Sequence, residues 1–182
     1  MATKVVSNLK EAIELAKVTD GMSISFHHHL RNGDHVLNMV MDELAAMGVK
    51  NLTVNASAVF DVHAPLIDHI KNGVVTKLCV NYMSKGIGTH ICKGIMDTPV
   101  EFRSHGQRPA DIENGRTPID VAFIAAPTSD TMGNCTGKMG KSRFGSIGYA
   151  MADAMNAKTV IVITDNLVEY PLTCASITED YV

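Results

Sequence analysis

The stretch from Ile119 to Gly137 reads IDVAFIAAPTSDTMGNCTG and decides the fold class. Up to Ala126 it is an apolar run with a single charge, Asp120. A short run rich in Val, Ile and Phe is typical of a strand that is buried on both faces, and such strands lie at the centre of parallel sheets. Pro127 ends the run because proline cannot donate a hydrogen bond to a sheet ladder. The stretch therefore predicts a central parallel strand that leads into a polar turn.

The turn from Asp130 to Asn134 is rich in residues that tolerate positive φ. In open α/β sheets, ligands bind beyond the carboxyl ends of the strands. Asp130, Gly133 and Asn134 are therefore candidate substrate-binding residues. The alternative interpretation is that they form a well-made turn and nothing more.

The rest of the chain alternates between strand and helix patterns. Further strands are expected at 22–26, 51–55, 74–80, 100–103 and 159–164, and helices at 9–16, 35–47, 65–71 and 146–155. A polar turn is expected at 111–118, whereas 84–96 is ambiguous because its glycines weaken a helical spacing of isoleucines. This alternation predicts an α/β fold with an open, mostly parallel sheet and helices on both faces.

Capping residues and apolar spacing define these helices. Ser7 or Asn8 is expected to cap the first helix with Glu11 as the capping-box partner. Asp34 is expected to cap the second helix and Gly48 to end it. The expected buried faces comprise Val36, Met39, Val40, Leu44 and Met47 in the second helix, and Ile147, Ala150 and Met151 in the last. The strand at 159–164 is expected to be buried.

The bulk properties exclude several classes of function. A chain of 182 residues suffices for one domain with a substantial core. A formal charge of −3 gives no reason to expect nucleic acid or a membrane as a partner. No apolar run approaches the ~20 residues of a membrane span, and the amino terminus lacks a signal-peptide core, so we expect a cytoplasmic protein. The cysteines form no C-x-x-C pair and are expected to be free thiols.

The three consecutive histidines, His27 to His29, follow a predicted strand. Neighbouring strand residues point to opposite faces, so at most His27 and His29 could share a metal, and we expect no metal site. We interpret the segment as a polar loop that faces an anionic substrate. His27, His28, Arg31 and Gly33 are its candidate substrate-binding residues, since arginine binds carboxylates and glycine lets backbone approach closely. A metal-dependent hydrolase built on the histidines stays open as an alternative.

Two further groups of polar residues are candidate anion sites. Ser104, His105, Gly106 and Arg108 lie in a segment that suits a polycarboxylate. Ion pairs of its arginines with Asp111 or Glu113 are an equally good interpretation. The other group is a set of cations that could bind the phosphates of a CoA-like group or could simply be a solvated loop, namely Lys138, Lys141 and Arg143.

Several spaced segments carry a family resemblance. Asp120-Val-Ala-Phe-Ile followed by Asp130-x-x-Gly-Asn resembles a segment of the CoA-transferases. The chain from about Leu9 onward is similar to the alpha subunit of bacterial citrate lyase, in segments that begin with Ser25-Phe-His-His, Asn38-Met-Val-Met-Asp, His63-Ala-Pro-Leu, Ser104-His-Gly and Gly145-Ser-Ile-Gly-Tyr-Ala. Members of that family are more than twice as long. The resemblance therefore implies that residues 1–182 are a single CoA-transferase-like domain, the amino-terminal half of a two-domain chain.

The resemblance also implies a reaction and partners. A citrate CoA-transferase exchanges acetyl for citryl on a carrier thioester through a mixed anhydride, without a covalent enzyme intermediate. We therefore name no catalytic residue and expect no tightly bound cofactor. The CoA-like prosthetic group is presented by an acyl carrier protein.

The other implied partners are citrate, the lyase subunit, and the second domain of its own chain, in a hetero-oligomer. This domain alone is expected to be inactive. Two alternatives stay open. One is a module that only docks the carrier, and the other is a CoA-transferase for another carboxylate.

Overall fold

The computed structural model describes residues 3–27 and 29–182. Its main sheet has six strands in the order β4-β3-β2-β1-β5-β8, and every pair is parallel. The strands are β1 (Ser23–Phe26), β2 (Leu52–Val59), β3 (Val75–Met83), β4 (Glu101–Phe102), β5 (Val121–Ala125) and β8 (Thr159–Ile163).

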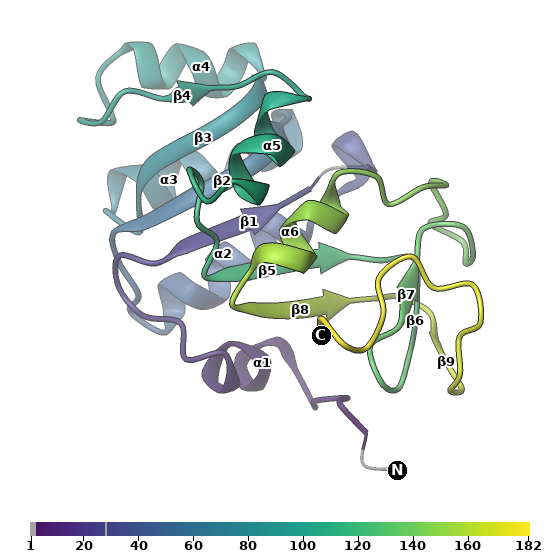
Figure 1. The fold of residues 1–182 in the computed structure, drawn as a ribbon. Helices are drawn as coiled ribbons and strands as arrows, with labels where there is room; N and C mark the ends of the chain where they lie inside the picture. Colours follow the sequence, from purple (N-terminus) through teal and green to yellow (C-terminus); the bar gives the residue numbers. More distant parts are fainter. Residues whose placement is uncertain (1–2, 28) are drawn as a thin grey trace.

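Helices cover both faces of this sheet (Figure 1). They are α1 (Leu9–Leu15), α2 (Val36–Ala46), α3 (Leu66–Lys71), α4 (Lys85–Cys92), α5 (Gln107–Glu113) and α6 (Ala150–Asn156). In Figure 1, α5 and α6 lie in front of the sheet, whereas α2 and α3 lie behind it. The predicted α/β class, with an open and mostly parallel sheet, is confirmed.

Strand β5 has the central place that its sequence predicts. It lies between β1 and β8, and all its residues are buried. Val121 and Phe123 belong to the core beneath α1 to α4, whereas Ala122 and Ile124 belong to the core beneath α5 and α6. This alternation explains the unbroken apolar run, because side chains of a strand point to opposite faces and both faces here are covered.

A second, smaller sheet was not predicted. It consists of β7 (Cys135–Thr136), β6 (Thr128–Asp130) and β9 (Leu167–Val168), in that order. Pro127 ends the core strand as predicted, but the chain enters β6 at the next residue. The predicted turn from Asp130 to Asn134 connects β6 to β7, and the other partner, β9, lies far away along the chain.

Asn8 caps the first helix as predicted, whereas the N-cap of α2 is His35 and the predicted cap, Asp34, lies one residue before it. The Glu11 backbone N–H donates to Asn8 Oδ1 at 2.9 Å, and the Ser7 N–H donates to Glu11 Oε2 at 2.7 Å. The Val36 N–H donates to Asp34 Oδ1 at 2.9 Å. Gly48 follows α2 with a φ of 81°, the left-handed conformation that ends helices.

The predicted polar turn at 111–118 is wrong in its first part, because Asp111 lies inside α5 and is buried, and the turn follows the helix at 114–117. Its carboxylate pairs with Arg103 and, at 3.4 Å, with Arg116. The segment is expected to be a turn because it is polar. Ion pairs with residues outside the helix allow that charge to be buried.

Two predicted helix faces need correction. The buried residues of α2 are Leu37, Val40, Met41 and Leu44, while Met39 is 50% exposed. The predicted and the observed residues both have helical spacing. In the folded chain, the row of side chains that begins at Leu37 is buried, and not the row that begins at Val36. The last helix begins at Ala150 and not at 146, since Gly148 has a φ of 58° that a helix cannot contain, and Met151 points outward at 39% exposure.

Strand β8 was expected to be buried, and this is wrong for most of its residues. Val160 is buried, but Ile161, Val162 and Ile163 are only partly so. The reason is its position, since β8 is the edge strand of the main sheet as described by residues 3–27 and 29–182. Its apolar sequence is that of an interior strand.

Candidate functional site

The carboxyl ends of the parallel strands bring the histidine loop and the Ser104 segment to one edge of the sheet. His27 and His29 follow β1, and His105 follows β4. The third contributor is the segment between β7 and α6, which supplies Phe144 and Tyr149. Ligands of open α/β sheets bind at this edge. His28, also a predicted site residue, lies outside the described residues.

Hydrogen bonds fix the tautomers of two histidines. The Ala125 backbone N–H donates to His27 Nε2 at 3.0 Å. Because Nε2 accepts, a neutral His27 carries its proton on Nδ1, which lies 2.6 Å from His29 Nδ1. His29 Nδ1 therefore accepts in turn, and a neutral His29 carries its proton on Nε2. A buried backbone amide of β5 thus sets His29 as a hydrogen-bond donor through Nε2.

Aromatic stacking orients the His29 ring. It stacks on Phe144 with ring centroids 4.2 Å apart, and lies 5.7 Å from the Tyr149 ring at 21°. His105 meets the Tyr149 ring edge-on at 6.1 Å. We call His27, His29, His105, Phe144 and Tyr149 the aromatic cluster. The aromatic cluster brings together the histidine loop and the Ser104 segment, which the sequence predicted as two separate anion sites.

A buried ion pair supports Tyr149 from below. Arg108 on α5 and Asp153 on α6 form two hydrogen bonds of 2.7 Å, and both side chains are buried. Burial alone would lower the pKa of Arg108, but Asp153 outweighs burial and raises it, so the guanidinium stays charged. The Arg108 Cζ lies 5.8 Å from the centroid of the Tyr149 ring. Arg108 was expected in a polar loop that faces citrate, but it lies in the helix α5. Both terminal nitrogens of its guanidinium donate to Asp153.

The other candidate residues of the Ser104 segment are more accessible to solvent than Arg108. Ser104, His105 and Gly106 are exposed before α5, and the Gln107 N–H donates to Ser104 Oγ at 3.1 Å. Arg103 beside them pairs with Asp111 and, at 2.6 Å, with Glu101, so the ion-pair interpretation holds for this arginine.

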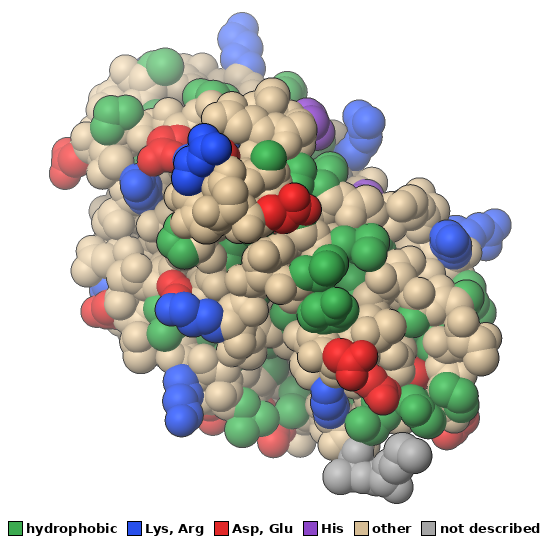
Figure 2. Space-filling model, viewed as in Figure 1, with side chains coloured by type: hydrophobic (Ala, Val, Ile, Leu, Met, Phe, Trp, Pro, Cys, Tyr) green, Lys and Arg blue, Asp and Glu red, His purple; other side chains and the backbone are tan. Residues whose placement is uncertain are grey.

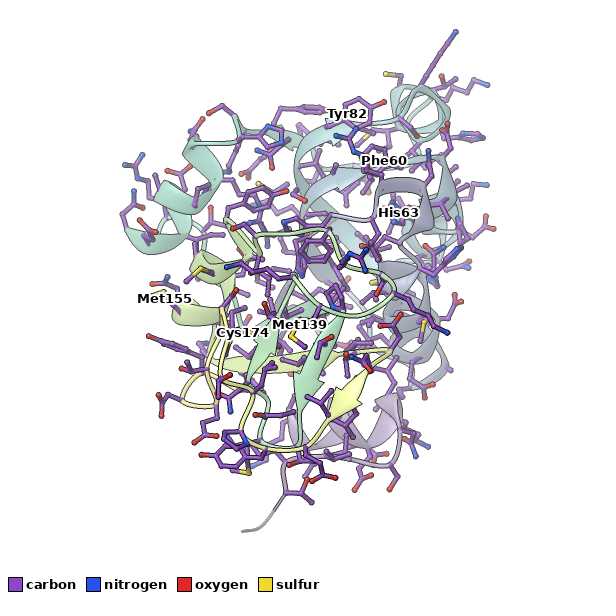
Figure 3. The ribbon with its side chains drawn as sticks, turned by 90° about the vertical axis from the view of Figure 1, so that its right-hand side faces the viewer. Phe60, His63, Tyr82, Met139, Met155 and Cys174 are labelled. Atoms are coloured by element: carbon purple, nitrogen blue, oxygen red, sulfur yellow. The ribbon has the colours of Figure 1, made fainter. Side chains whose placement is uncertain are left out.

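Arg31 and Gly33 lie on the exposed 3₁₀ turn η1 (Arg31–Gly33). His63, in the turn η2 (Asp61–His63), anchors η1. Its Nδ1 accepts from the Phe60 N–H at 2.9 Å, so its Nε2 donates to the Asp34 carbonyl oxygen at 3.1 Å. The buried ring lies beside Phe60, which in turn lies beside Tyr82 (Figure 3). The match of His63-Ala-Pro-Leu to the family pattern therefore coincides with a structural histidine that holds the loop after β1.

The turn that follows β6 is fully bonded within the protein. Asp130 accepts from the backbone N–H groups of Met132, Asn134 and Leu172 and from Asn134 Nδ2. Asn134 also binds Glu179, and a Cβ at Gly133 would lie 2.5 Å from Val182 Cγ1. These residues hold the carboxyl-terminal segment, and no contact given above joins them to the aromatic cluster.

Asp130 gives the fold an acid-sensitive contact. Burial would raise the pKa of its carboxyl, but the hydrogen bonds listed above outweigh burial and hold it below the usual value of about 3.9. A depressed pKa stabilises the fold above the unfolded pKa, and this contribution is lost as the pH falls through the folded pKa. We expect Asp130→Asn to destabilise the chain at pH 7, with a difference from wild type that shrinks below about pH 4. Urea unfolding over this range measures it; a pH-independent difference would contradict it.

The cations proposed for phosphate binding lie on the exposed loop between β7 and α6. Lys138, Lys141 and Arg143 are all exposed, and Ser142 between them donates to Asp165 at 3.0 Å. Backbone packs tightly beneath this loop, since a Cβ at Gly137 would lie 2.5 Å from the Gly145 oxygen. On the face seen in Figure 2, Lys and Arg side chains are spread around the rim and form no single patch.

The cysteines differ sharply in accessibility. All four are free thiols in the structure, with Cys79 and Cys135 buried and Cys92 and Cys174 exposed. Burial, with the nearby Asp130 carboxylate, raises the pKa of Cys135 to about 12. We expect a thiol reagent at pH 8 to label only Cys92 and Cys174 in the folded chain and all four after denaturation, as read by peptide mass spectrometry. Equal labelling of Cys135 and Cys174 before denaturation would refute this assignment.

The described chain has neither a metal-binding cluster nor a membrane-spanning helix. Residues 3–27 and 29–182 contain no group of three or more His, Cys, Asp or Glu arranged to hold a metal ion. None of the helices in these residues combines the length and apolar character that crossing a membrane requires.

Sequence reasoning missed the stacking residues of the site. His29 was placed in the substrate-facing loop but was not named as a site residue, and Phe144 and Tyr149 were not proposed at all. Tyr149 does lie in the Gly145-Ser-Ile-Gly-Tyr-Ala segment that carries part of the family resemblance, so that segment held the signal. Nothing in the spacing along the chain indicates that it meets His29.

Comparison with known proteins gives one consistent result. Residues 2–182 match the family described as citrate lyase, alpha subunit. The citrate lyase alpha chains of Escherichia coli K12 and Haemophilus influenzae are each 45% identical to this chain over 98% of its length. The chain spans only about a third of these relatives, 35% and 36% of their lengths.

Solved structures agree in fold. The alpha subunit of citrate lyase from Streptococcus mutans, solved in complex with citrate, is 50% identical, with a TM-score of 0.97 over 100% of this chain and 36% of its own. Glutaconate coenzyme A-transferase from Acidaminococcus fermentans shares the fold at 15% identity, with a TM-score of 0.68 over 96% of this chain and 73% of its own. The match across nearly every residue establishes that the chain belongs to the citrate lyase alpha-subunit family.

Proposed function

We propose that this chain provides one wall of the active site of a citrate CoA-transferase, in which citrate displaces acetate from a thioester on an acyl carrier protein. The observation that carries the proposal is the close match over the whole chain to an alpha subunit solved with citrate. The aromatic cluster at the carboxyl edge of the sheet adds a site of suitable chemistry.

The proposed reaction has two steps. A citrate carboxylate oxygen attacks the thioester carbonyl of the acetyl carrier, which gives an acetyl–citryl anhydride and releases the carrier thiolate. The thiolate then attacks the citryl carbonyl, which gives the citryl carrier and releases acetate. Both steps pass through an oxyanion, and fixed hydrogen-bond donors stabilise such a charge.

Among the described residues, we assign His29 as the hydrogen-bond donor to this oxyanion. Its Nε2–H is set by the hydrogen bonds from Ala125 through His27, and its ring stacks with Phe144 and Tyr149. A donor whose orientation is fixed in advance needs no reorganisation when charge develops. His105, which meets the Tyr149 ring edge-on, is a second imidazole of the aromatic cluster.

Arg31 is the arginine proposed for a citrate carboxylate. It is exposed on η1, next to the loop that carries His29. Arg108 is not part of this proposal, because both terminal nitrogens of its guanidinium already bond Asp153. Lys138, Lys141 and Arg143 remain the proposed contacts for the phosphates of the carrier's CoA-like group, which suits their exposure and charge.

The test is a hybrid subunit, in which this chain replaces the matching region of the E. coli alpha chain. Supplied with acetyl carrier protein, the hybrid should consume the thioester in a citrate-dependent way at close to the parent rate. This chain alone should be inactive, because it spans only about a third of the relatives and would provide one wall of the site. A hybrid that folds and binds the carrier without consuming the thioester would favour the docking-module alternative.

A further inference from the structure

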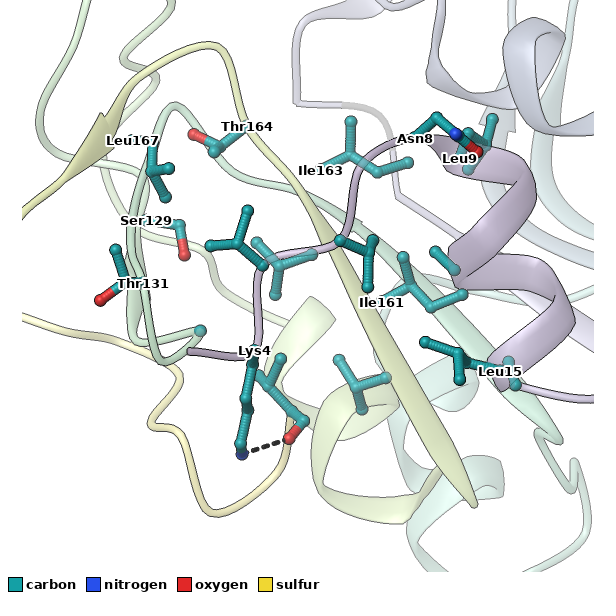
Figure 4. A pocket seen from close by; sticks show the side chains of 18 of the residues that line it. Lys4, Asn8, Leu9, Leu15, Ser129, Thr131, Ile161, Ile163, Thr164 and Leu167 are labelled. Atoms are coloured by element: carbon teal, nitrogen blue, oxygen red, sulfur yellow. Dashed lines mark hydrogen bonds between the residues drawn. The ribbon is translucent and has the colours of Figure 1, made fainter. Parts of the chain in front are cut away.

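Two grooves of the described chain differ in how their polar groups are bonded. In the groove beside β8 and α1, Lys4 Nζ already donates to the carbonyl oxygens of Glu179 and Val182 at 2.6 Å each (Figure 4). The groove between α4 and β4 instead contains a buried hydroxyl, that of Ser84, which has no hydrogen-bond partner among the described residues. This second groove is therefore the one that lacks a polar partner.

The groove between α4 and β4 lies at the end of the main sheet that β4 forms (Figure 1). Its volume is about 560 Å³. The lining comes from the end of β3, from one face of α4 and from β4, and it includes Met83, Ser84, Lys85, Cys92, Lys93 and Phe102. Most of its wall is thus apolar, with a serine and two lysines as its polar part.

Ser84 is the N-cap residue of α4, yet its side chain makes no capping hydrogen bond. It is only 4% exposed, and its Oγ is buried without a partner. A serine in this position ordinarily accepts a hydrogen bond from a backbone N–H of the first helical turn. A buried hydroxyl without any partner costs free energy, and a ligand atom that bonds it would recover that cost.

The backbone next to Ser84 favours a negatively charged ligand. The N–H groups of Lys85, Gly86 and Ile87 have no acceptor among the described residues, as is usual for the first turn of a helix. The Gly88 N–H donates to the Ser84 carbonyl oxygen at 3.0 Å, so the helical bonding begins at this point. Free N–H groups and the helix dipole together make a helix start a site for anions.

The charged side chains around the groove also favour an anion. Lys85 and Lys93 line it, and neither forms an ion pair within the part of the chain that the structure describes. Glu101 on β4 is already paired with two cations. The Asp61 carboxylate approaches α4 from another side, where its Oδ1 would lie 3.4 Å from a Cβ at Gly86, and it does not line the groove.

We propose that the groove between α4 and β4 binds a small monocarboxylate with an apolar body, whose oxygens accept from Ser84 Oγ and from the free N–H groups of α4. The apolar body contacts Met83, Cys92 and Phe102, and the last of these is 62% exposed in the empty groove. An anion without an apolar part would leave this wall in water. The proposal is independent of the proposed reaction, because no residue of the aromatic cluster lines this groove.

Nuclear magnetic resonance titration of this chain tests the ligand class. Hexanoate should shift the amide signals of Lys85, Gly86 and Ile87 with a saturable curve. Acetate has the charge without the apolar body, and hexanol has the apolar body without the charge, so each should bind at least about tenfold more weakly. Phosphate that binds as tightly as hexanoate would overturn the ligand class. The absence of saturable shifts at these amides with about 50 mM hexanoate, a Kd equivalent to under 2 kcal/mol of binding, would overturn the site.

Replacing Ser84 with alanine separates binding from folding. Hexanoate should bind about tenfold more weakly, because a hydrogen bond to a charged group is lost. The melting temperature should stay within about 2 °C of wild type or rise, because the hydroxyl has no partner to lose. Ser7→Ala is the matched control before α1, where Asn8 is the cap, and it should change neither quantity.

Two outcomes of the Ser84→Ala experiment would contradict the proposal. Unchanged hexanoate binding would remove Ser84 from the site. A fall in melting temperature of more than about 5 °C would mean that the hydroxyl stabilises the fold through a partner within the chain.

Discussion

Replacing His29 with alanine should lower citrate-dependent acyl transfer by the hybrid subunit about a hundredfold. That is the usual loss when one fixed donor to an oxyanion is removed. The effect should fall on kcat more than on KM for citrate, because an oxyanion donor binds the transition state better than the substrate. Steady-state kinetics with acetyl carrier protein and varied citrate measures both.

Two matched variants separate this role from packing. His29→Gln keeps an N–H donor at a similar reach and should recover part of the lost rate. His90→Ala makes the same change on α4, which contributes no residue to the aromatic cluster, and should leave kcat unchanged. A His29→Ala rate within about twofold of wild type, in a folded hybrid, would remove His29 from the site.

Replacing Arg108 with alanine should destabilise the fold by about 3–5 kcal/mol, the usual cost of leaving one charge of a buried pair without its partner. Asp153 is fully buried and bonds both guanidinium nitrogens, so the variant strands a carboxylate between α5 and α6. For a chain of this size the melting temperature should fall by about 10 °C. Chemical denaturation of this chain measures the free energy of unfolding directly.

The double variant Arg108→Met/Asp153→Leu is the control for this pair. Replacing both charges by apolar side chains removes the stranded carboxylate and should restore most of the stability. The surface pair Lys10–Glu14, 4.0 Å apart on α1, is the contrast, since breaking it should cost less than about 1 kcal/mol. If Arg108→Ala and Lys10→Ala cost the same, the buried pair does not support α5 and α6 as described.

The sequence predicted those parts of the fold in which local pattern and burial agree. The run before Pro127 predicted a central parallel strand, and β5 is one because both of its faces are covered. Asn8 and Glu11 predicted a helix start that depends only on neighbouring residues. In these places the interactions that decide the structure lie within a few residues along the chain.

Prediction failed where residues far apart in sequence decide the structure. Asp111 reads as part of a solvated turn until its pairing with Arg103 is known. The aromatic cluster depends on His29 meeting Tyr149, and no spacing along the chain indicates that contact. The apolar sequence of β8 indicated an interior strand, whereas the described residues leave it at an edge.

The mass of the carrier protein after reaction tests the central claim most directly. The hybrid subunit is incubated with acetyl carrier protein and citrate, and the carrier is weighed by intact-protein mass spectrometry while free acetate is assayed. Transfer predicts that the acetyl carrier becomes the citryl carrier, with one acetate released for each citryl group gained and no change when citrate is left out. Conversion to the free thiol carrier, with or without citrate, would mean hydrolysis and would contradict the assignment of this chain to a citrate-dependent transferase.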